Sequence, residues 1–367
     1  MKHGCLPLDN NNINPSSMSL AEPRPEAIHY LEISTQQFAE ELVVVPGRPS
    51  WEQPWIQPEL RYELFEHGVD GLRTYCLLDA ARVTELDKVF DTDSLDELGM
   101  KCLLSGDAAK EIKNYAPYLV DISLSEEAIK NGDISSFHRQ LFTQYWGKHC
   151  AIFIKSTADL STLTLHLKKF IKLRNDDDKW FYFRFYDPRI GKDYFSWMQQ
   201  DAQRVAKWFG INKGQSLIES IILETDSGKS FTALKPINTE QLTALGKVSL
   251  SSEELNSMQF FRWQTTKQEI FKAISEDVRQ APFLIESLEQ KEVDDLCESA
   301  LAEGFETQRA IYDYVFTQAL AQHFNLDLSE VNQYLQAKDS ADLEKSKELY
   351  QILLNAINTY RTSQQEV

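Results

Sequence analysis

Charged side chains follow two apolar runs of this chain, at positions where they could do chemistry. Asp79 and Arg82 come after the apolar residues 74–78, and Asp187 and Arg189 come after an aromatic run. Carboxylates and guanidinium groups at strand ends can form an active site. More often they form ion pairs and turn caps that hold a connection in place. We therefore expect Asp79, Arg82 and Asp187 to have structural roles.

The alternative is a hydrolase or transferase that uses Asp79, Asp187 and His149. It requires these side chains to converge in a cleft and one carboxylate to have a perturbed pKa. The sequence has no GxGxxG, GxSxG or HExxH motif, and its seven histidines lack the spacing of metal ligands. Gly228-Lys229-Ser230 resembles the end of a phosphate-binding loop, but Leu223 stands where that loop needs a glycine. We expect no catalytic residue, no cofactor and no metal ion.

The aromatic run at residues 180–186, Trp-Phe-Tyr-Phe-Arg-Phe-Tyr, is the most distinctive element of the sequence. Its aromatic content predicts a β-strand that is buried on at least one face. Pro188 is expected to end this strand, because proline has no backbone N–H to donate. Arg184 within the strand and Pro188 after it are also expected to have structural roles.

Apolar runs and polar turns alternate along the first part of the chain, which predicts a mixed α/β fold. The predicted strands are residues 74–78, 101–104, 119–122, 150–155, 180–186, 217–223 and 230–234. The last two strands are expected to pair as a hairpin through Asp226-Ser227-Gly228. The predicted helices are residues 84–90, 125–131, 134–145, 159–171 and 200–209.

The sequence is expected to divide into four parts. Residues 1–25, with Asn, Ser and Pro and little apolar content, predict a flexible tail. Residues 26–236 form the mixed α/β lobe, residues 237–263 a polar joint, and residues 264–367 an all-helical lobe. The helical lobe carries nine Lys and Arg against nineteen Asp and Glu. Such charge usually lies on a solvated helix face, and an acidic docking surface is the alternative.

Composition excludes several classes of protein. With 367 residues, 42% of them hydrophobic, the chain is long enough for two or three compact units. Its net charge of −18 argues against non-specific nucleic-acid binding, so we expect protein partners. The five cysteines have no CxxC spacing, which argues against a disulfide framework and a zinc site and favours the cytoplasm. No apolar run approaches the about 20 residues of a membrane helix.

Four motifs, in this order, resemble those of one known family. They are Leu-Leu-Asp-Ala-Ala-Arg at residues 77–82, Ala-Pro-Tyr-Leu-Val at 116–120, Trp-Gly-Lys-His-Cys-Ala-Ile-Phe at 146–153 and Phe-Arg-Phe-Tyr-Asp-Pro-Arg at 183–189. Together they are similar to the effector chaperones, or adaptors, of the bacterial type VI secretion system. The resemblance covers residues 72–195, and Glu-Gly-Phe-Glu-Thr-Gln at 303–308 resembles the helical C-terminal part of the same family.

The resemblance implies a non-enzymatic cytoplasmic protein that binds one secreted toxin. It implies binding near the effector's N-terminal targeting or membrane-inserting part, and loading of the effector onto the C-terminal region of a VgrG spike protein. It also implies that the adaptor stays behind when the spike is fired. The alternative is an immunity protein that neutralises a toxin, which should bind the toxin's catalytic domain.

Aromatic side chains are the candidates for partner binding, because they are frequent anchors of interfaces. One candidate group, expected in a cleft between the α/β lobe and the helical lobe, consists of the aromatic residues Tyr118, Trp146 and Tyr186 together with Arg189. The second consists of Trp51 and Trp55, in a proline-rich stretch that we expect to be an ordered, irregular loop. Large aromatic residues are buried on average, so a role in the core is the alternative for all of them.

Overall fold

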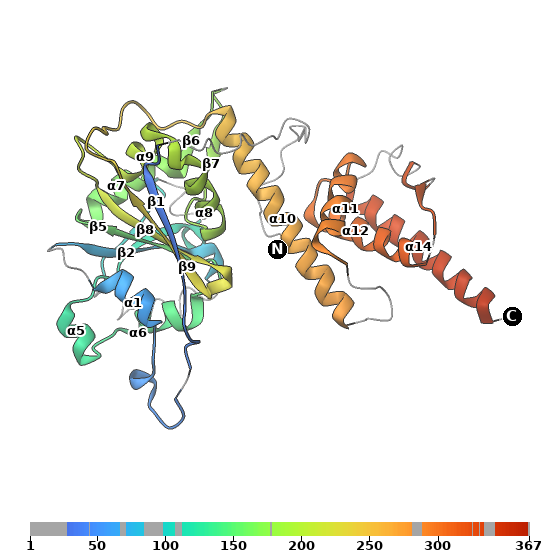
Figure 1. The fold of residues 1–367 in the computed structure, drawn as a ribbon, viewed down its shortest axis with the longest axis horizontal. Coiled ribbons are helices and arrows are strands. Elements are labelled where there is room, and N and C mark those ends of the chain that lie inside the picture. The colour runs from blue at the N-terminus through green and yellow to red at the C-terminus, as the bar shows by residue number, and fades with distance from the viewer. Residues whose placement is uncertain are drawn as a thin grey trace. The chain divides into compact units, whose positions relative to one another are not determined.

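The chain forms two compact units that divide between Met258 and Gln259 (Figure 1). The computed structural model describes residues 28–43, 45–66, 71–83, 98–106, 112–176, 178–280, 288–324, 326–329, 331–333 and 342–365. The tail expected at residues 1–25 and the helix expected at residues 84–90 lie outside these ranges. The first unit combines a β-sheet with helices and the second is helical, which is the fold class that the sequence predicts.

A seven-stranded antiparallel sheet forms the centre of the first unit. Its strands, in spatial order, are β1 (Leu31–Gln37), β9 (Ser230–Pro236), β8 (Ile218–Thr225), β5 (Ala151–Ser156), β2 (Arg73–Asp79), β4 (Pro117–Asp121) and β3 (Met100–Cys102). All neighbouring strands are antiparallel. β8 and β9 pair as the predicted hairpin, which turns at Asp226–Gly228.

Both faces of this sheet are buried. Along β2, Tyr75 and Leu77 face one core, and Cys76 and Leu78 face the other, because side chains alternate along a strand. The first core is covered by α7 (Leu160–Ile171), α8 (Pro188–Trp197) and α9 (Ala202–Phe209). The second is covered by α1 (Pro58–Phe65) and α6 (Ser136–Gln140), with the π turn Leu141–Tyr145 that follows α6. The short helix α5 (Glu126–Asn131) buries no residue.

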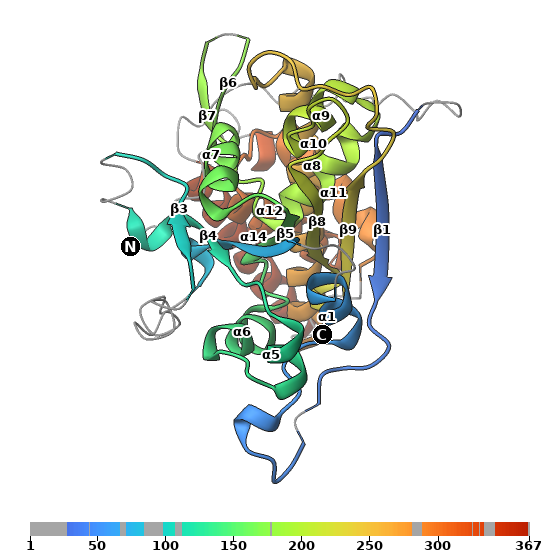
Figure 2. The same ribbon diagram turned by 90° about the vertical axis from the view of Figure 1, so that its left-hand side faces the viewer.

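The aromatic run does not form the long core strand that the sequence predicts. Only β7 (Trp180–Tyr182) is a strand, and it pairs with β6 (Lys172–Arg174) in a separate two-stranded ribbon, seen near the top of Figure 2. Phe183 and Phe185 are buried, but in the irregular segment between β7 and α8, with ring centroids 6.0 and 4.9 Å from that of Trp208. Burial of these aromatics comes from packing against helices and not from a central ladder.

Pro188 also has a different role from the predicted one, because the ladder has already ended at Tyr182. Pro188 is the first residue of α8. Proline is favoured at the first position of a helix, where its missing N–H would have no intrahelical partner. The Asp187 side chain caps this helix by accepting the backbone N–H of Arg189 at 3.1 Å.

A buried polar network in the first unit holds the start of α10 (Ser252–Gln280). Glu254 accepts hydrogen bonds from the Tyr194 hydroxyl (2.8 Å) and the Ser251 backbone N–H (2.7 Å). Its carboxylate also lies 2.8 Å from Arg204 Nε. Trp208 Nε1 donates to the Tyr194 hydroxyl at 3.0 Å. The helix therefore leaves the first unit from a fully partnered ionic site.

The second unit is built from helices around one apolar core. α10 continues into it, followed by α11 (Gln290–Ala302), α12 (Gln308–His323) and α14 (Asp342–Gln365). Val293, Val315 and Leu349, one from each of the last three helices, are fully buried in this core. None of the described helices combines the length and the apolar character that a membrane span requires.

Candidate functional site

One end of the seven-stranded sheet brings together charged residues that are far apart in the sequence. Because β2, β5 and β8 are antiparallel neighbours, the end of β2, the start of β5 and the end of β8 lie together. The backbone N–H of Asp79 donates to the carbonyl of Cys150 at 2.7 Å, and that of Ala80 donates to Ala116 at 3.2 Å. The motifs at residues 77–82, 116–120 and 146–153 therefore meet at this charged end of the sheet.

Asp79 is fully buried at the end of β2 and is paired with Arg184. Its Oδ1 accepts the backbone N–H of Ala81 at 3.2 Å, which caps the tight turn Ala80–Arg82. Burial raises the pKa of Asp79 above its ordinary value, and the charge and hydrogen bond of Arg184 offset only part of this effect. Arg184 therefore favours the ionised form of Asp79, against the effect of burial.

Asp187 is the second buried carboxylate at this end, and two arginines surround it. Arg189 Nη2 donates to Oδ2 at 2.8 Å, and Arg82 Nη1 lies 3.5 Å from the same oxygen. Burial acts to raise the pKa of Asp187, but the hydrogen bonds and charge of Arg189, with the charge of Arg82, outweigh burial and hold the pKa below its ordinary value. Asp187 is thus ionised and fully engaged by guanidinium groups.

These ion pairs connect the first and the fourth motif in both directions. Asp79 and Arg82 belong to the first motif, and they pair with Arg184 and Asp187 of the fourth. The exit of β2 is therefore tied to the turn that leads into α8. Two such ion pairs fix the position of the two segments relative to each other. Apolar contacts alone constrain that position only weakly.

Glu224 at the end of β8 is a further member of the charged end, and sequence reasoning missed it. Its buried carboxylate accepts the backbone N–H groups of Gly147 (2.6 Å) and His149. His149 Nδ1 lies 2.7 Å from Glu224 Oε1, without the alignment of a hydrogen bond. Trp146 Nε1 donates to the carbonyl of Gly228 at 2.7 Å. The turn of the third motif is thus fastened to the β8–β9 hairpin.

Each group of the enzymatic alternative has its own partner. Asp79 is paired with Arg184, Asp187 with Arg189, and His149 lies against Glu224. Neither aspartate is therefore an unpaired base that faces a substrate cleft. In the part of the chain that the structure describes, no three His, Cys, Asp or Glu side chains are grouped as metal ligands. What this arrangement can do is hold four motifs in one rigid geometry.

The six candidate partner-binding residues differ in how much of their surface is exposed. Tyr186 is buried, and Arg189 is paired with Asp187. Tyr118, Trp146 and Trp55 are partly buried against the cores of the sheet, and Trp55 packs against Phe142 with ring centroids 5.6 Å apart. Trp51 is 67% exposed. Of the six, Trp51 thus offers the most free aromatic surface to a partner.

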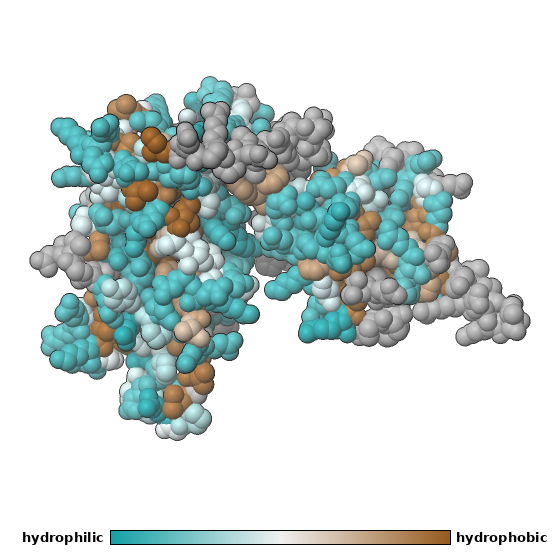
Figure 3. All heavy atoms as spheres, in the orientation of Figure 1, coloured by the Kyte–Doolittle hydropathy of each residue, from teal (hydrophilic) through white to brown (hydrophobic). Residues whose placement is uncertain are grey.

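Hydrophobic side chains on the visible face of the molecule are scattered between hydrophilic ones (Figure 3). The exposed large apolar residues include Trp51, Tyr62, Tyr115, Trp180 and Tyr182. Isolated apolar residues are normal on a protein surface, whereas clusters indicate interfaces. We therefore expect a partner to bind at a particular cluster of exposed aromatic residues.

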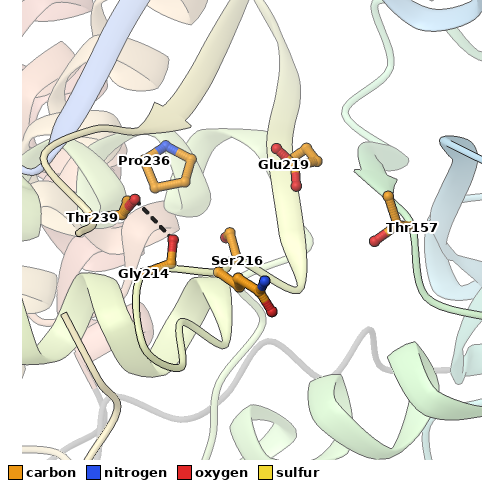
Figure 4. Close-up of a pocket in the computed structure, with 7 residues that line it drawn as sticks. Thr157, Gly214, Ser216, Glu219, Pro236 and Thr239 are labelled. Carbon is orange, nitrogen blue, oxygen red and sulfur yellow. Dashed lines mark hydrogen bonds between the residues drawn. The ribbon is translucent and has the colours of Figure 1, made fainter. Parts of the chain in front are cut away.

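A polar hollow of about 370 Å³ lies at the opposite end of the sheet, near the start of β8 and the end of β9 (Figure 4). Its lining includes Thr157, Ser216, Glu219 and Thr239. Ser216 Oγ donates to the carbonyl of Ile218 at 2.6 Å, and Thr239 Oγ1 donates to that of Gly214 at 3.0 Å. Both hydroxyls are thus used by the backbone. Among the lining residues that the structure describes, Glu219 alone is charged.

Comparison with models of protein families gives a match to part of the chain. A family described as a domain of unknown function (DUF4123) matches residues 74–204. This range starts in β2, ends in α9 and contains all four sequence motifs, but it includes neither β8 and β9 nor the second unit. The comparisons with curated proteins and with solved structures gave no match.

Proposed function

We propose that this chain is a non-catalytic cytoplasmic adaptor that binds a type VI secretion effector and helps to load it onto a VgrG spike protein. The observation that carries the proposal is the DUF4123 match, because residues 74–204 contain every one of the four motifs on which the resemblance to these adaptors rests. The same residues converge at the charged end of the sheet. Because the four motifs contact one another in space, they form one structural unit and are not a chance set of short matches.

The geometry of the charged end favours an adaptor over an enzyme. Its buried carboxylates are consumed by internal ion pairs and backbone hydrogen bonds. A catalytic base must instead reach a substrate proton. The paired residues of the motifs therefore stabilise the fold of the first unit. Exposed side chains outside these pairs recognise the partner.

An adaptor has to bind its cargo firmly and also release it, which favours an interface of moderate size with a few aromatic anchors. The proposed cargo segment is the N-terminal or membrane-inserting part of the effector, and the second partner is the C-terminal region of the spike protein. Apolar cargo segments need cover before delivery, and exposed aromatic side chains such as Trp51 can provide it.

Co-production of the full chain with the effector and the spike protein tests the proposal. The chain carries an affinity tag, and the partners are offered as an N-terminal effector fragment, an effector catalytic domain and a spike C-terminal fragment. We expect capture of the N-terminal effector fragment and of the spike fragment. Capture of the catalytic domain alone would instead indicate an immunity protein, and capture of no fragment would reopen the enzymatic alternative.

A pair of variants then asks whether Trp51 anchors the cargo. Trp51→Ala should weaken capture of the effector fragment by about tenfold or more if this side chain is an anchor. Tyr62→Ala is the matched control, because Tyr62 is 64% exposed on α1 and Trp51 is 67% exposed. Equal capture by both variants would remove Trp51 from the interface and leave the adaptor function itself untouched.

A further inference from the structure

The two-stranded ribbon of β6 and β7 has one buried and one exposed face. Its register pairs Lys172 with Tyr182, Leu173 with Phe181 and Arg174 with Trp180. Leu173 is buried and Phe181 packs against the same core, so this central pair faces inward. Because side chains alternate along a strand, the other two pairs share the outer face. That face therefore presents Lys172, Arg174, Trp180 and Tyr182, and we call it the basic aromatic face.

The four side chains of the basic aromatic face contact one another. Lys172 Nζ lies 5.0 Å from the ring centroid of Trp180 and 5.8 Å from that of Tyr182, and Arg174 Cζ lies 5.4 Å from the centroid of Trp180. Cations over aromatic rings attract each other at these distances. Trp180 is nevertheless 56% exposed and Tyr182 48% exposed. The rings are thus held in place, and much of their surface remains available.

Arginine, tryptophan and tyrosine are the residue types that most often dominate binding energy at protein interfaces. Here one Arg, one Trp and one Tyr lie on a single small face, with a lysine among them. Arg174 also pairs with Asp178 at 3.2 Å, but both side chains are largely exposed, so this pair is weak and a partner carboxylate can replace it. The helix α7, which precedes β6 in the chain, also carries the exposed residues Leu165 and Lys169.

The charge of this region selects the kind of partner. Residues 165–182 contain five Lys and Arg against three Asp, whereas the whole chain has a net charge of −18. A local basic surface on an acidic protein complements a carboxylate-bearing segment. A nucleic acid is disfavoured because its long row of phosphates would also face the acidic remainder of the chain. A short acidic peptide segment contacts only the local surface.

We propose that the basic aromatic face binds an acidic segment of a protein partner, with carboxylates placed on Lys172 and Arg174 and apolar side chains on Trp180 and Tyr182. The inference rests on the adaptor function, because it assigns one surface of the chain to the effector or the spike protein. It adds a surface that lies outside the candidate residues inferred from the sequence.

The test compares the wild-type full chain with the double variant Lys172→Glu and Arg174→Glu in capture of the N-terminal effector fragment and the spike C-terminal fragment. We expect the double variant to lose about tenfold or more in affinity for one of the two fragments. Trp180→Ala should weaken capture of the same fragment, and capture by the wild type should fall with added salt. The control is the double variant Lys130→Glu and Lys213→Glu, which makes the same charge change at two exposed lysines that are not part of the ribbon.

Unchanged capture of both fragments by the Lys172 and Arg174 variant would overturn the inference while the adaptor function stands. Equal losses in the control would also overturn it, because net charge alone would explain them. If the wild type captures neither fragment, the adaptor function fails. NMR titration of the Trp180 indole N–H with a peptide of alternating Glu and Leu then decides the inference separately. Saturable shifts that the double variant abolishes support it, and their absence, or equal shifts with a short single-stranded RNA, refutes it.

Discussion

Replacement of Asp187 tests the charged end of the sheet most directly. Asp187→Asn keeps the shape of the side chain and an oxygen for the backbone N–H of Arg189, which lies 3.1 Å from Oδ1. It turns an amide NH₂ toward Arg189 Nη2 at 2.8 Å and Arg82 Nη1 at 3.5 Å, so donors face donors. Hydrogen bonds to charged groups contribute about 1.5–3 kcal/mol each. Because both arginines are 30% exposed and can be rehydrated, we expect a loss of about 2–3 kcal/mol in total.

Urea unfolding followed by near-UV circular dichroism measures this loss in the transition of the first unit. Asp178→Asn is the matched control, because its carboxylate also pairs with an arginine, at 3.2 Å, but is 76% exposed. We expect the control to change the free energy of unfolding by less than about 0.5 kcal/mol. Equal changes in the two variants would refute the reasoning that burial makes the Asp187 pairs important.

The acid dependence gives a second measurement on the same residue. The pKa of Asp187 in the folded state lies below its ordinary value of 3.8. Ionised Asp187 therefore stabilises the fold above pH 3.8, and this stabilisation is lost as the pH falls through the folded-state pKa. The stability difference between wild type and Asp187→Asn should therefore shrink in acid. Asp79 behaves oppositely, because burial raises its pKa above 3.8. The relative stability of Asp79→Asn should increase as the pH rises through that raised pKa.

Three other features give expected outcomes. Glu254→Gln should cost about 2–4 kcal/mol in urea unfolding, because it weakens charged hydrogen bonds at a buried site, whereas the exposed neighbour Glu253→Gln should change little. Gly228→Ala should lower the melting temperature more than Gly246→Ala. Both glycines have a positive φ, but of the two only Gly228 would place a Cβ 2.7 Å from another backbone atom. Equal shifts in melting temperature would contradict this reasoning. In β1, the backbone amides of every second residue from Leu31 onward point away from β9 and have no partner in that strand. They should exchange their protons with D₂O faster than the amides of the residues between them. Uniform exchange along β1 would show a different register.

Much of the first unit can be predicted from the sequence because its central strands are buried on both faces. The core strands β2, β5 and β8 contain the apolar runs 75–78, 151–154 and 221–223, and short apolar runs between polar turns predict strands. The hairpin of β8 and β9 is local, so its turn residues suffice to predict the pairing. β1, α1 and α8 were not predicted. β1 is a polar edge strand whose register with β9 joins residues about two hundred positions apart.

The aromatic run shows where local pattern fails. Its aromatic content predicts burial correctly for Phe183 and Phe185, but not for Trp180 and Tyr182. Burial of an aromatic ring depends on whether other elements pack against it. Trp208 of α9 packs against Phe183 and Phe185, in the second half of the run. No pattern within seven residues contains that information.

The sequence by itself determined the fold class, the two kinds of unit and the identity of Asp79, Arg82, Arg184 and Asp187 as residues of interest, because these depend on composition and local order. Only the tertiary structure decided their pairing, since the two bonds between the end of β2 with its following turn and the segment before α8 join positions 105 residues apart. It likewise brought Glu224 to the third motif and left the basic aromatic face uncovered. Ion pairs and exposure are properties of distances in space, and those distances are set when the antiparallel sheet closes and its helices pack.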